Sequence, residues 1–265
     1  MGVEDASEKR AVKEQLLRAS RRHDRVDGID CWIDDRDNVF FDACIVSCEA
    51  KLGHENLFYP YSFVSSQVTM GSRNRIFCGA IVGGSAQTKK DSGNVIVGNS
   101  NMIFEYATIS CGVNNNSTRI GNGNIIMTHS HIGHDCNIGN NVTIGNYAQV
   151  AGHVSINDLA TIGAFTCIRQ RIAVGGISFI IPRSEVRKHI RPFQFIGRRT
   201  NRKYQVNIIG MRRYGMNLSD IRKIEEFLSG KLVPWEIDLH DCDATLDFRS
   251  IVVKFEQSKQ DVMKK

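Results

Sequence analysis

The chain has 265 residues, of which 42% are hydrophobic, and a formal net charge of +6. Such a chain can bury the core of one domain and carry additional segments. No apolar run approaches the roughly 20 residues of a membrane span, and the chain does not open with the pattern of a signal peptide. We therefore expect no integral membrane segment and a cytoplasmic protein.

Eight cysteines are scattered along the chain without a C-x-x-C pair. This spacing indicates neither a zinc knuckle nor a disulfide framework, and we expect reduced thiols and no metal site.

Residues 1–40 are predicted to form an N-terminal helical extension and linker. Residues 5–22 have the composition of a helix with a thin apolar stripe, and residues 23–37 form a charged run that we interpret as a linker.

A six-residue repeat then occupies residues 41–182. Every sixth residue from Val46 to Val82 is hydrophobic, and the spacing resumes at Val97 after an interruption. Eleven consecutive sixth positions from Ile120 to Ile180 are Ile or Val. This period fits neither a helix nor a half-buried strand, but it is typical of parallel β-helices. We therefore predict a mainly β fold.

In such a fold three hexads form an 18-residue coil, and coils stack at about the 4.8 Å spacing of neighbouring strands. Residues 18 apart should thus be vertical neighbours. Glycine follows the hydrophobic residue at several corners, where a Cβ would obstruct the bend. The interruptions at residues 83–93 and 111–119 are predicted to be external loops.

The 18-residue rule gathers polar residues on one corner. It places Gly152 above His134, His153 above Asp135, and Gln170 above Gly152. We interpret this arrangement as a catalytic notch, in which His134 is a general base oriented by Asp135 or by a backbone carbonyl, and the Gly152 N–H stabilises an oxyanion. The alternative is a set of solvated corner residues.

At these residues the chain resembles a known family, the bacterial acyl-[acyl carrier protein]:UDP-N-acetylglucosamine O-acyltransferases, which begin lipid A synthesis. The matching motifs are HIGHDC at 131–136, AGHV at 151–154, IGAFTCIRQ at 162–170, RPF at 191–193 and VNIIGMRRYG at 206–215. The resemblance covers about residues 46–215. It implies a left-handed β-helix, a homotrimer with sites between neighbouring subunits, and acyl transfer from acyl carrier protein to a hydroxyl of UDP-N-acetylglucosamine without a further cofactor.

The resemblance also implies roles for individual residues. The catalytic residues would be His134, Asp135 and Gly152. The substrate-binding residues would be Gln87, Lys90, His131, His153, Gln170, Asn207 and Arg213. Three positions depart from the family pattern: Thr88 replaces an acidic residue, Ser110-Cys111 replaces His-Arg, and Arg169 replaces His. These departures suggest an altered sugar or acyl pocket.

The C-terminal region, residues 183–265, is expected to be basic and helical. The repeat is predicted to stop after Ile180, where Pro182 and Pro192 interrupt it, and many Arg and Lys residues lie between Arg183 and Arg213. Such a patch could hold a diphosphate, an acidic carrier protein or nucleic acid, or it could be a solvated face. Beside the proposed acyltransferase site we favour the acidic partner and expect no nucleic acid. Residues 218–229 are predicted to form an amphipathic helix capped by Ser219, with a second helical element in the tail.

Three other functions remain open. The acceptor could be the amino group of a nucleotide amino sugar, because the same base would serve. A non-catalytic β-helix scaffold is a second alternative. A zinc enzyme like the γ-class carbonic anhydrases is disfavoured, because that class needs an upstream histidine and none lies between His54 and His129.

Overall fold

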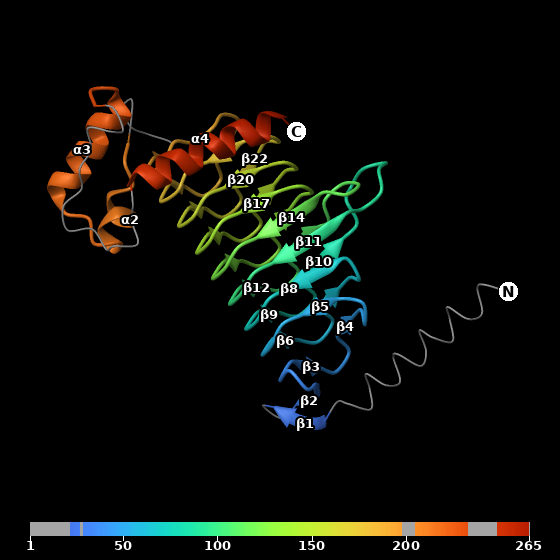
Figure 1. Cartoon of the computed structure of the whole chain (residues 1–265). Coiled ribbons are helices and arrows are strands. Elements are labelled where there is room, and N and C mark those ends of the chain that lie inside the picture. The colour runs from blue at the N-terminus through green and yellow to red at the C-terminus, as the bar shows by residue number, and fades with distance from the viewer. Residues whose placement is uncertain (1–21, 27–28, 198–204, 233–247, 265) are drawn as a thin grey trace.

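Short strands joined by corners wind the chain into a column of stacked coils (Figure 1). The computed structural model describes residues 22–26, 29–197, 205–232 and 248–264. Each regular coil contributes one strand to each of three parallel sheets, so strands three positions apart in the chain are neighbours. The predicted fold class, a left-handed parallel β-helix followed by helices, is confirmed.

The first sheet contains, in spatial order, β1 (Arg22–Val26), β2 (Ile29–Ile33), β3 (Val39–Phe41), β6 (Leu57–Phe58), β9 (Arg75–Ile76), β12 (Met102–Ile103), β15 (Ile125–Ile126), β18 (Thr143–Ile144), β21 (Thr161–Ile162), β24 (Phe179–Ile180) and β26 (Phe195–Ile196). The second sheet contains β25 (Glu185–Val186), β22 (Cys167–Ile168), β19 (Gln149–Val150), β16 (His131–Ile132), β13 (Thr108–Ser110), β10 (Ile81–Gly84), β7 (Phe63–Val64) and β4 (Ile45–Val46). The third sheet contains β23 (Ala173–Val174), β20 (Ser155–Ile156), β17 (Asn137–Ile138), β14 (Ser117–Ile120), β11 (Asn94–Val97), β8 (Val68–Met70) and β5 (Lys51–Leu52).

The sixth-position residues form the core of the column. Ile126 pairs with Ile144, which in turn pairs with Ile162, and all three are fully buried. The predicted rule that residues 18 apart are vertical neighbours is therefore confirmed in this part of the chain. β-Branched residues suit these positions because their stiff side chains pack well on a pleated surface.

A ladder of buried asparagines runs up the corner between the third and first sheets. In the lower rungs each amide oxygen accepts hydrogen bonds from the backbone and side-chain nitrogens of the asparagine above it, as Asn74 does from Asn101 at 2.9 Å, whereas Asn101 accepts from the backbone nitrogen of Asn124. The ladder consists of Asn38, Asn56, Asn74, Asn101 and Asn124. Because buried amides must find partners, this ladder fixes one asparagine per coil at this corner.

The glycines after the hydrophobic positions are required by the stacking of the coils. A Cβ on Gly145 would lie 2.6 Å from the backbone nitrogen of Ala164 in the next coil, and one on Gly133 would lie 2.9 Å from the Gly152 nitrogen. The predicted obstruction is confirmed. The left-handed backbone conformation instead falls two residues later, at residues such as Asp135 and Tyr147, with φ of 59° and 58°.

The repeat continues beyond Ile180, contrary to our expectation. Val186 pairs with Ile168, and Ile196 pairs with Ile180, so another coil is added to the column. The prolines are tolerated because Pro182 and Pro192 occupy corner positions, where Gly163 and Gly175 approach them closely. At a corner position no strand hydrogen bond requires the backbone N–H that proline lacks.

The charged run near the N-terminus is a β-hairpin, so the expected linker is wrong. Strands β1 and β2 pair antiparallel, and β2 pairs antiparallel with β3. Within the described residues the hairpin therefore extends the first sheet. The helix predicted over residues 5–22 lies outside the described residues, apart from Arg22, which begins β1.

The two interruptions of the repeat contact each other. Gly93 N donates to Gly112 O at 2.8 Å, and Asn114 N donates to Asp91 O at 2.7 Å. Both loops leave the corner between the second and third sheets, because each connects a strand of one to a strand of the other. The insertions also change the vertical spacing, which is 27 residues between Asn74 and Asn101.

Helices α2 (Ile208–Arg213) and α3 (Leu218–Ser229) lie beyond the last coils, and α4 (Phe248–Lys264) lies along the coils (Figure 1). The predicted helix at 218–229 is confirmed, but its N-cap is Asn217, whose side chain accepts from Asp220 N at 2.9 Å. Helix α4 is attached to the third-sheet side by Lys254, which lies 2.6 Å from Asp158. Among the described residues, no helix has the length and apolar character to cross a membrane.

Candidate active site

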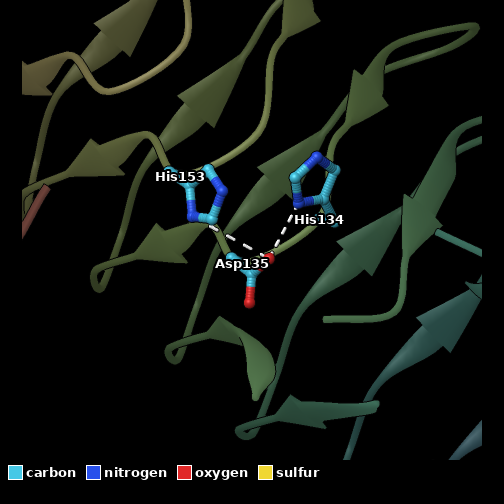
Figure 2. A group of neighbouring side chains, drawn as sticks. All are labelled: His134, Asp135 and His153. Carbon is cyan, nitrogen blue, oxygen red and sulfur yellow. Dashed lines mark hydrogen bonds and ion pairs between the residues drawn. The ribbon is translucent and has the colours of Figure 1, made fainter. Parts of the chain in front are cut away.

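His134, Asp135 and His153 gather at the corner between the second and third sheets (Figure 2). His134 Nδ1 lies 2.7 Å from Asp135 Oδ2, and His153 Nδ1 lies 3.8 Å from the same oxygen. The two imidazole rings are nearly perpendicular, with centroids 4.9 Å apart. The three residues that the 18-residue rule placed together are therefore in contact.

The Asp135 carboxylate is held in place from below. Its side chain is fully buried, whereas the side chains of His134 and His153 are 14% and 15% exposed. The backbone N–H of Val113 donates to Asp135 Oδ1 at 3.4 Å, and the Asp135 N–H donates to the Thr118 hydroxyl at 2.9 Å. The loop at residues 111–116 thus supports the His134–Asp135 pair. Nothing in the sequence indicated this contact between the loop and Asp135.

The hydrogen bond to Asp135 determines what His134 can do. A carboxylate only accepts hydrogen bonds, so the proton of the neutral imidazole is on Nδ1 and the Nε2 lone pair is free. This Nε2 atom faces Gly152, because a Cβ added to Gly152 would lie 2.5 Å from it. The predicted stacking of Gly152 on His134 is confirmed, and the missing side chain leaves room for the imidazole edge that carries this nitrogen.

The Gly152 N–H is a candidate oxyanion donor. Within the described residues it donates to no backbone or side-chain acceptor. Pro182 and Pro192 occupy equivalent corner positions in later coils and have no N–H, which shows that the coil does not need this donor. It therefore remains available for a ligand oxygen.

A cavity of about 450 Å³ opens beside this corner. Among the predicted residues it is lined by His131, His134, Gly152, Gln170 and Gln87. Sequence reasoning missed several further lining residues, including Gln149, Cys167 and Glu185. Their signal was available, because they stand 18 residues apart in the column above His131.

Two of the departures from the family pattern line the cavity. Ser110 and Arg169 do so, whereas Thr88 and Cys111 are not among the lining residues. Cys111 is buried and its thiol contacts Gly83 O at 3.4 Å, where it joins the base of the first loop. The altered positions are therefore divided between the cavity wall and the loop.

The charges around the cavity are partly paired. Arg187 donates to both carboxylate oxygens of Glu185, at 2.7 and 2.9 Å, and this contact lowers the pKa of Glu185. Burial lowers the pKa of His131, and the neighbouring His134 lowers it further. His131 is therefore neutral around pH 7, and its Nδ1 lies 2.8 Å from the Thr108 hydroxyl.

The remaining predicted substrate residues lie away from this cavity in the single chain. Lys90 is exposed on the first loop. Asn207 and Arg213 line a separate, largely apolar cavity of about 560 Å³ beside α2. Asn207 also has a structural role, because its amide caps α2 by accepting from Gly210 N and donates to Ile177 O at 2.8 Å. Of the basic patch, residues 198–204 lie outside the described residues.

His134, Asp135 and His153 also offer three donor atoms within 4.8 Å of one another, a spacing that a divalent ion could bridge. Two of these atoms already share the short hydrogen bond between His134 and Asp135. The arrangement therefore suits a hydrogen-bonded acid–base dyad, and the expectation of no metal stays a prediction.

Comparisons with known proteins agree with this architecture. The family model "Bacterial transferase hexapeptide (six repeats)" matches residues 117–148 and 135–170. In a solved structure, a UDP-N-acetylglucosamine acyltransferase from Bacteroides fragilis superposes with a TM-score of 0.65 and 25% identity, covering 82% of this chain and 96% of the other.

Several curated relatives carry one family name. The acyl-[acyl-carrier-protein]--UDP-N-acetylglucosamine O-acyltransferase of Alkalilimnicola ehrlichii is 31% identical over 57% of this chain and 63% of its own length. That of Nautilia profundicola is 31% identical over 62% of this chain and 67% of its own length. The chain spans about three fifths of the length of several curated relatives that it matches. It belongs to the family of the acyl-[acyl-carrier-protein]--UDP-N-acetylglucosamine O-acyltransferases.

Proposed function

We propose that the protein transfers an acyl group from acyl carrier protein to a hydroxyl of UDP-N-acetylglucosamine, the reaction that begins lipid A synthesis. The observation that carries this proposal is the orientation of His134. Its Nδ1 is held by Asp135, while its Nε2 faces Gly152 on the wall of the cavity that both residues line. Family membership supplies the substrate class, because the relatives are named for these substrates.

The geometry suggests how the residues would act. His134 Nε2 removes the proton of the acceptor hydroxyl as its oxygen attacks the thioester carbonyl. The carbonyl oxygen becomes negatively charged, and the Gly152 N–H stabilises it. When the intermediate collapses, the carbon–sulfur bond breaks and the departing sulfur takes the proton from His134. The buried Asp135 carboxylate stabilises the positive imidazolium in between.

The binding roles of the other residues follow from their places. Gln87, His131 and Gln170 line the cavity and would contact the bound sugar or acyl group. His153 lies 3.8 Å from Asp135 and would help to hold the carboxylate. Lys90, Asn207 and Arg213 do not reach this cavity within one chain, so their proposed substrate roles require another copy or loop movement.

We therefore also propose a homotrimer with sites between neighbouring subunits. The separation of the two cavities is consistent with this assembly, because residues of one subunit could complete the site of the next. Light scattering at micromolar concentration tests the assembly. A mass near 90 kDa is expected from the 29.7 kDa chain, and a monomeric mass would refute the trimer.

One observation favours a second acceptor. Ser110 and Arg169, which replace the residues usual in the family, both line the cavity. An altered wall could admit the amino group of a nucleotide amino sugar, which the same base would deprotonate.

The test is turnover by the purified protein with acyl carrier protein thioesters of graded chain length. The acceptors are UDP-N-acetylglucosamine and its 3-amino analogue, and acyl-coenzyme A serves as the alternative donor. We expect turnover with the carrier thioester and the hydroxyl acceptor. Turnover of the 3-amino analogue alone would replace the acceptor, and turnover of acyl-coenzyme A alone would reject the carrier protein as donor.

A further inference from the structure

Two histidines three residues apart on the cavity wall have partners of different chemistry. His134 Nδ1 contacts a carboxylate oxygen, whereas His131 Nδ1 contacts the hydroxyl of Thr108 at 2.8 Å. A carboxylate accepts only, but a hydroxyl can also donate. The structure therefore permits opposite tautomers at these two neighbouring residues.

The difference between the two partners matters only if the His131 ring is neutral, because only a neutral ring has alternative tautomers. Burial and the nearby His134 both lower the pKa of His131, so its ring carries one proton at neutral pH. Within the described residues, the side-chain contact of the Thr108 hydroxyl is with His131 Nδ1. If Thr108 donates, the proton of His131 is on Nε2 and is available to the cavity that the ring lines.

Thr108 is brought to His131 by the fold. The two residues are directly opposite in neighbouring strands, β13 and β16, of the second sheet. Their spacing is 23 residues because the loop at 111–116 interrupts the repeat, so the 18-residue rule does not pair them.

We propose that Thr108 is a positioning residue that holds His131 with its proton on Nε2, as a hydrogen-bond donor to an oxygen of the nucleotide sugar. His134, with the opposite tautomer, then presents a lone pair to the acceptor. One wall of the cavity thus carries a fixed donor beside a fixed base. This inference rests on the proposed function for the identity of the ligand, but the tautomer itself does not depend on it.

The first test is spectroscopic. The full chain is labelled with 15N-histidine, and the tautomers are assigned from long-range proton–nitrogen correlations, with His131→Ala identifying the signals. We expect the Nε2-protonated form of His131 in the wild type. Thr108→Val removes the donor at similar volume and should produce a mixture of tautomers, whereas Thr108→Ser should restore the wild-type signals. A wild-type His131 proton on Nδ1, or unchanged signals in Thr108→Val, would overturn the proposal.

The second test is kinetic. Loss of one oriented hydrogen bond should raise the KM for UDP-N-acetylglucosamine about three- to tenfold in Thr108→Val with little change in kcat, and Thr108→Ser should recover the KM. Thr143→Val is the matched control, because Thr143 holds the corresponding strand position in the first sheet, away from the cavity. An unchanged KM in Thr108→Val contradicts the positioning role. If the wild type shows no turnover, the proposed reaction fails, while the nitrogen signals still decide the tautomer.

Discussion

The coils and the C-terminal helices are held together in different ways. In the coils, outside the two loop insertions, vertical neighbours are separated by a nearly constant number of residues, as Asn122 and Asn140 are by 18. Helix α4 is instead attached through residues distant in the chain. Its apolar side chains pack on residues such as Phe193 and Ala173, and Lys254 contacts Asp158 and Ser258 contacts Asn157, which are 96 and 101 residues apart. A site built on the coils therefore has its geometry fixed by many equivalent hydrogen bonds, whereas the place of the helices depends on particular contacts between distant residues.

The substitution of His134 should have the largest effect on activity, and it tests whether this coil corner is the catalytic site. His134→Ala should reduce kcat by about 10²- to 10⁴-fold, as expected for the loss of a general base. The fold should be retained, because His134 lies at a corner and outside the apolar core. Steady-state kinetics and circular dichroism measure the two effects. His129→Ala is the control, since His129 is an exposed corner residue that stacks on Tyr147. Full activity in His134→Ala would reject the proposed base.

A slightly smaller effect is expected when the notch is filled. A Cβ at Gly152 would lie 2.5 Å from His134 Nε2, so Gly152→Ala should displace the imidazole and lower kcat by about 10²-fold. Gly84→Ala is the matched control, because the nearest atom to its added Cβ is 3.4 Å away. If Gly152→Ala and Gly84→Ala both kept the wild-type kcat, the coil could accommodate the added methyl group at Gly152. The claim that the coils fix the geometry at His134 would then be wrong.

Besides the buried asparagine ladder, the coils carry an exposed one, formed by Asn99, Asn122 and Asn140. Asn74 is fully buried and Asn122 is exposed, yet each amide oxygen accepts two hydrogen bonds from the asparagine of a neighbouring coil. Asn74→Ala leaves buried donors without an acceptor and should lower the free energy of unfolding by about 3 kcal/mol, against less than about 1 kcal/mol for Asn122→Ala. Urea denaturation of both variants measures the difference. Equal losses would show that burial does not set the strength of the ladder.

The smallest expected effect concerns pH and the attachment of α4. His189 Nδ1 accepts a hydrogen bond from Ala173 N at 3.0 Å, and burial lowers the pKa of His189, aided by Lys259 and opposed by Glu256. Because the folded protein disfavours the protonated form, this group contributes full stability above its usual pKa of 6.5 and loses it as pH falls toward the lower folded value.

His189→Gln should therefore flatten the decline of the unfolding midpoint between pH 7.5 and 5. His131, whose pKa is also lowered, leaves part of the decline in the variant. If the unfolding midpoint of His189→Gln fell as steeply with pH as that of the wild type, His189 would not contribute to the pH dependence of stability.

The sequence predicted the coil and much of its site because the repeat converts residue number into position. Wherever the spacing is 18, one hydrophobic residue per hexad defines the core, and Gly152 is placed on His134 without any further information. The prediction failed where residue number no longer gives the position of a residue in the coil. It stopped the repeat at Ile180, although prolines at corners remove no strand hydrogen bond, and it interpreted the β1–β2 hairpin as a linker because charged residues dominate that run.

The period of six alone specified a parallel β-helix, its stacked core and the contact between His134 and Gly152, while the left hand of the coil was implied by the family resemblance. The tertiary structure decided what surrounds them: the loop that brings Val113 to Asp135, the pairing of Thr108 with His131, the cavity walls, and the packing of α4 on the third sheet. These contacts depend on insertions and on residues far apart in the chain, whose relative positions are set by packing and hydrogen bonding of the whole molecule and not by any local repeat.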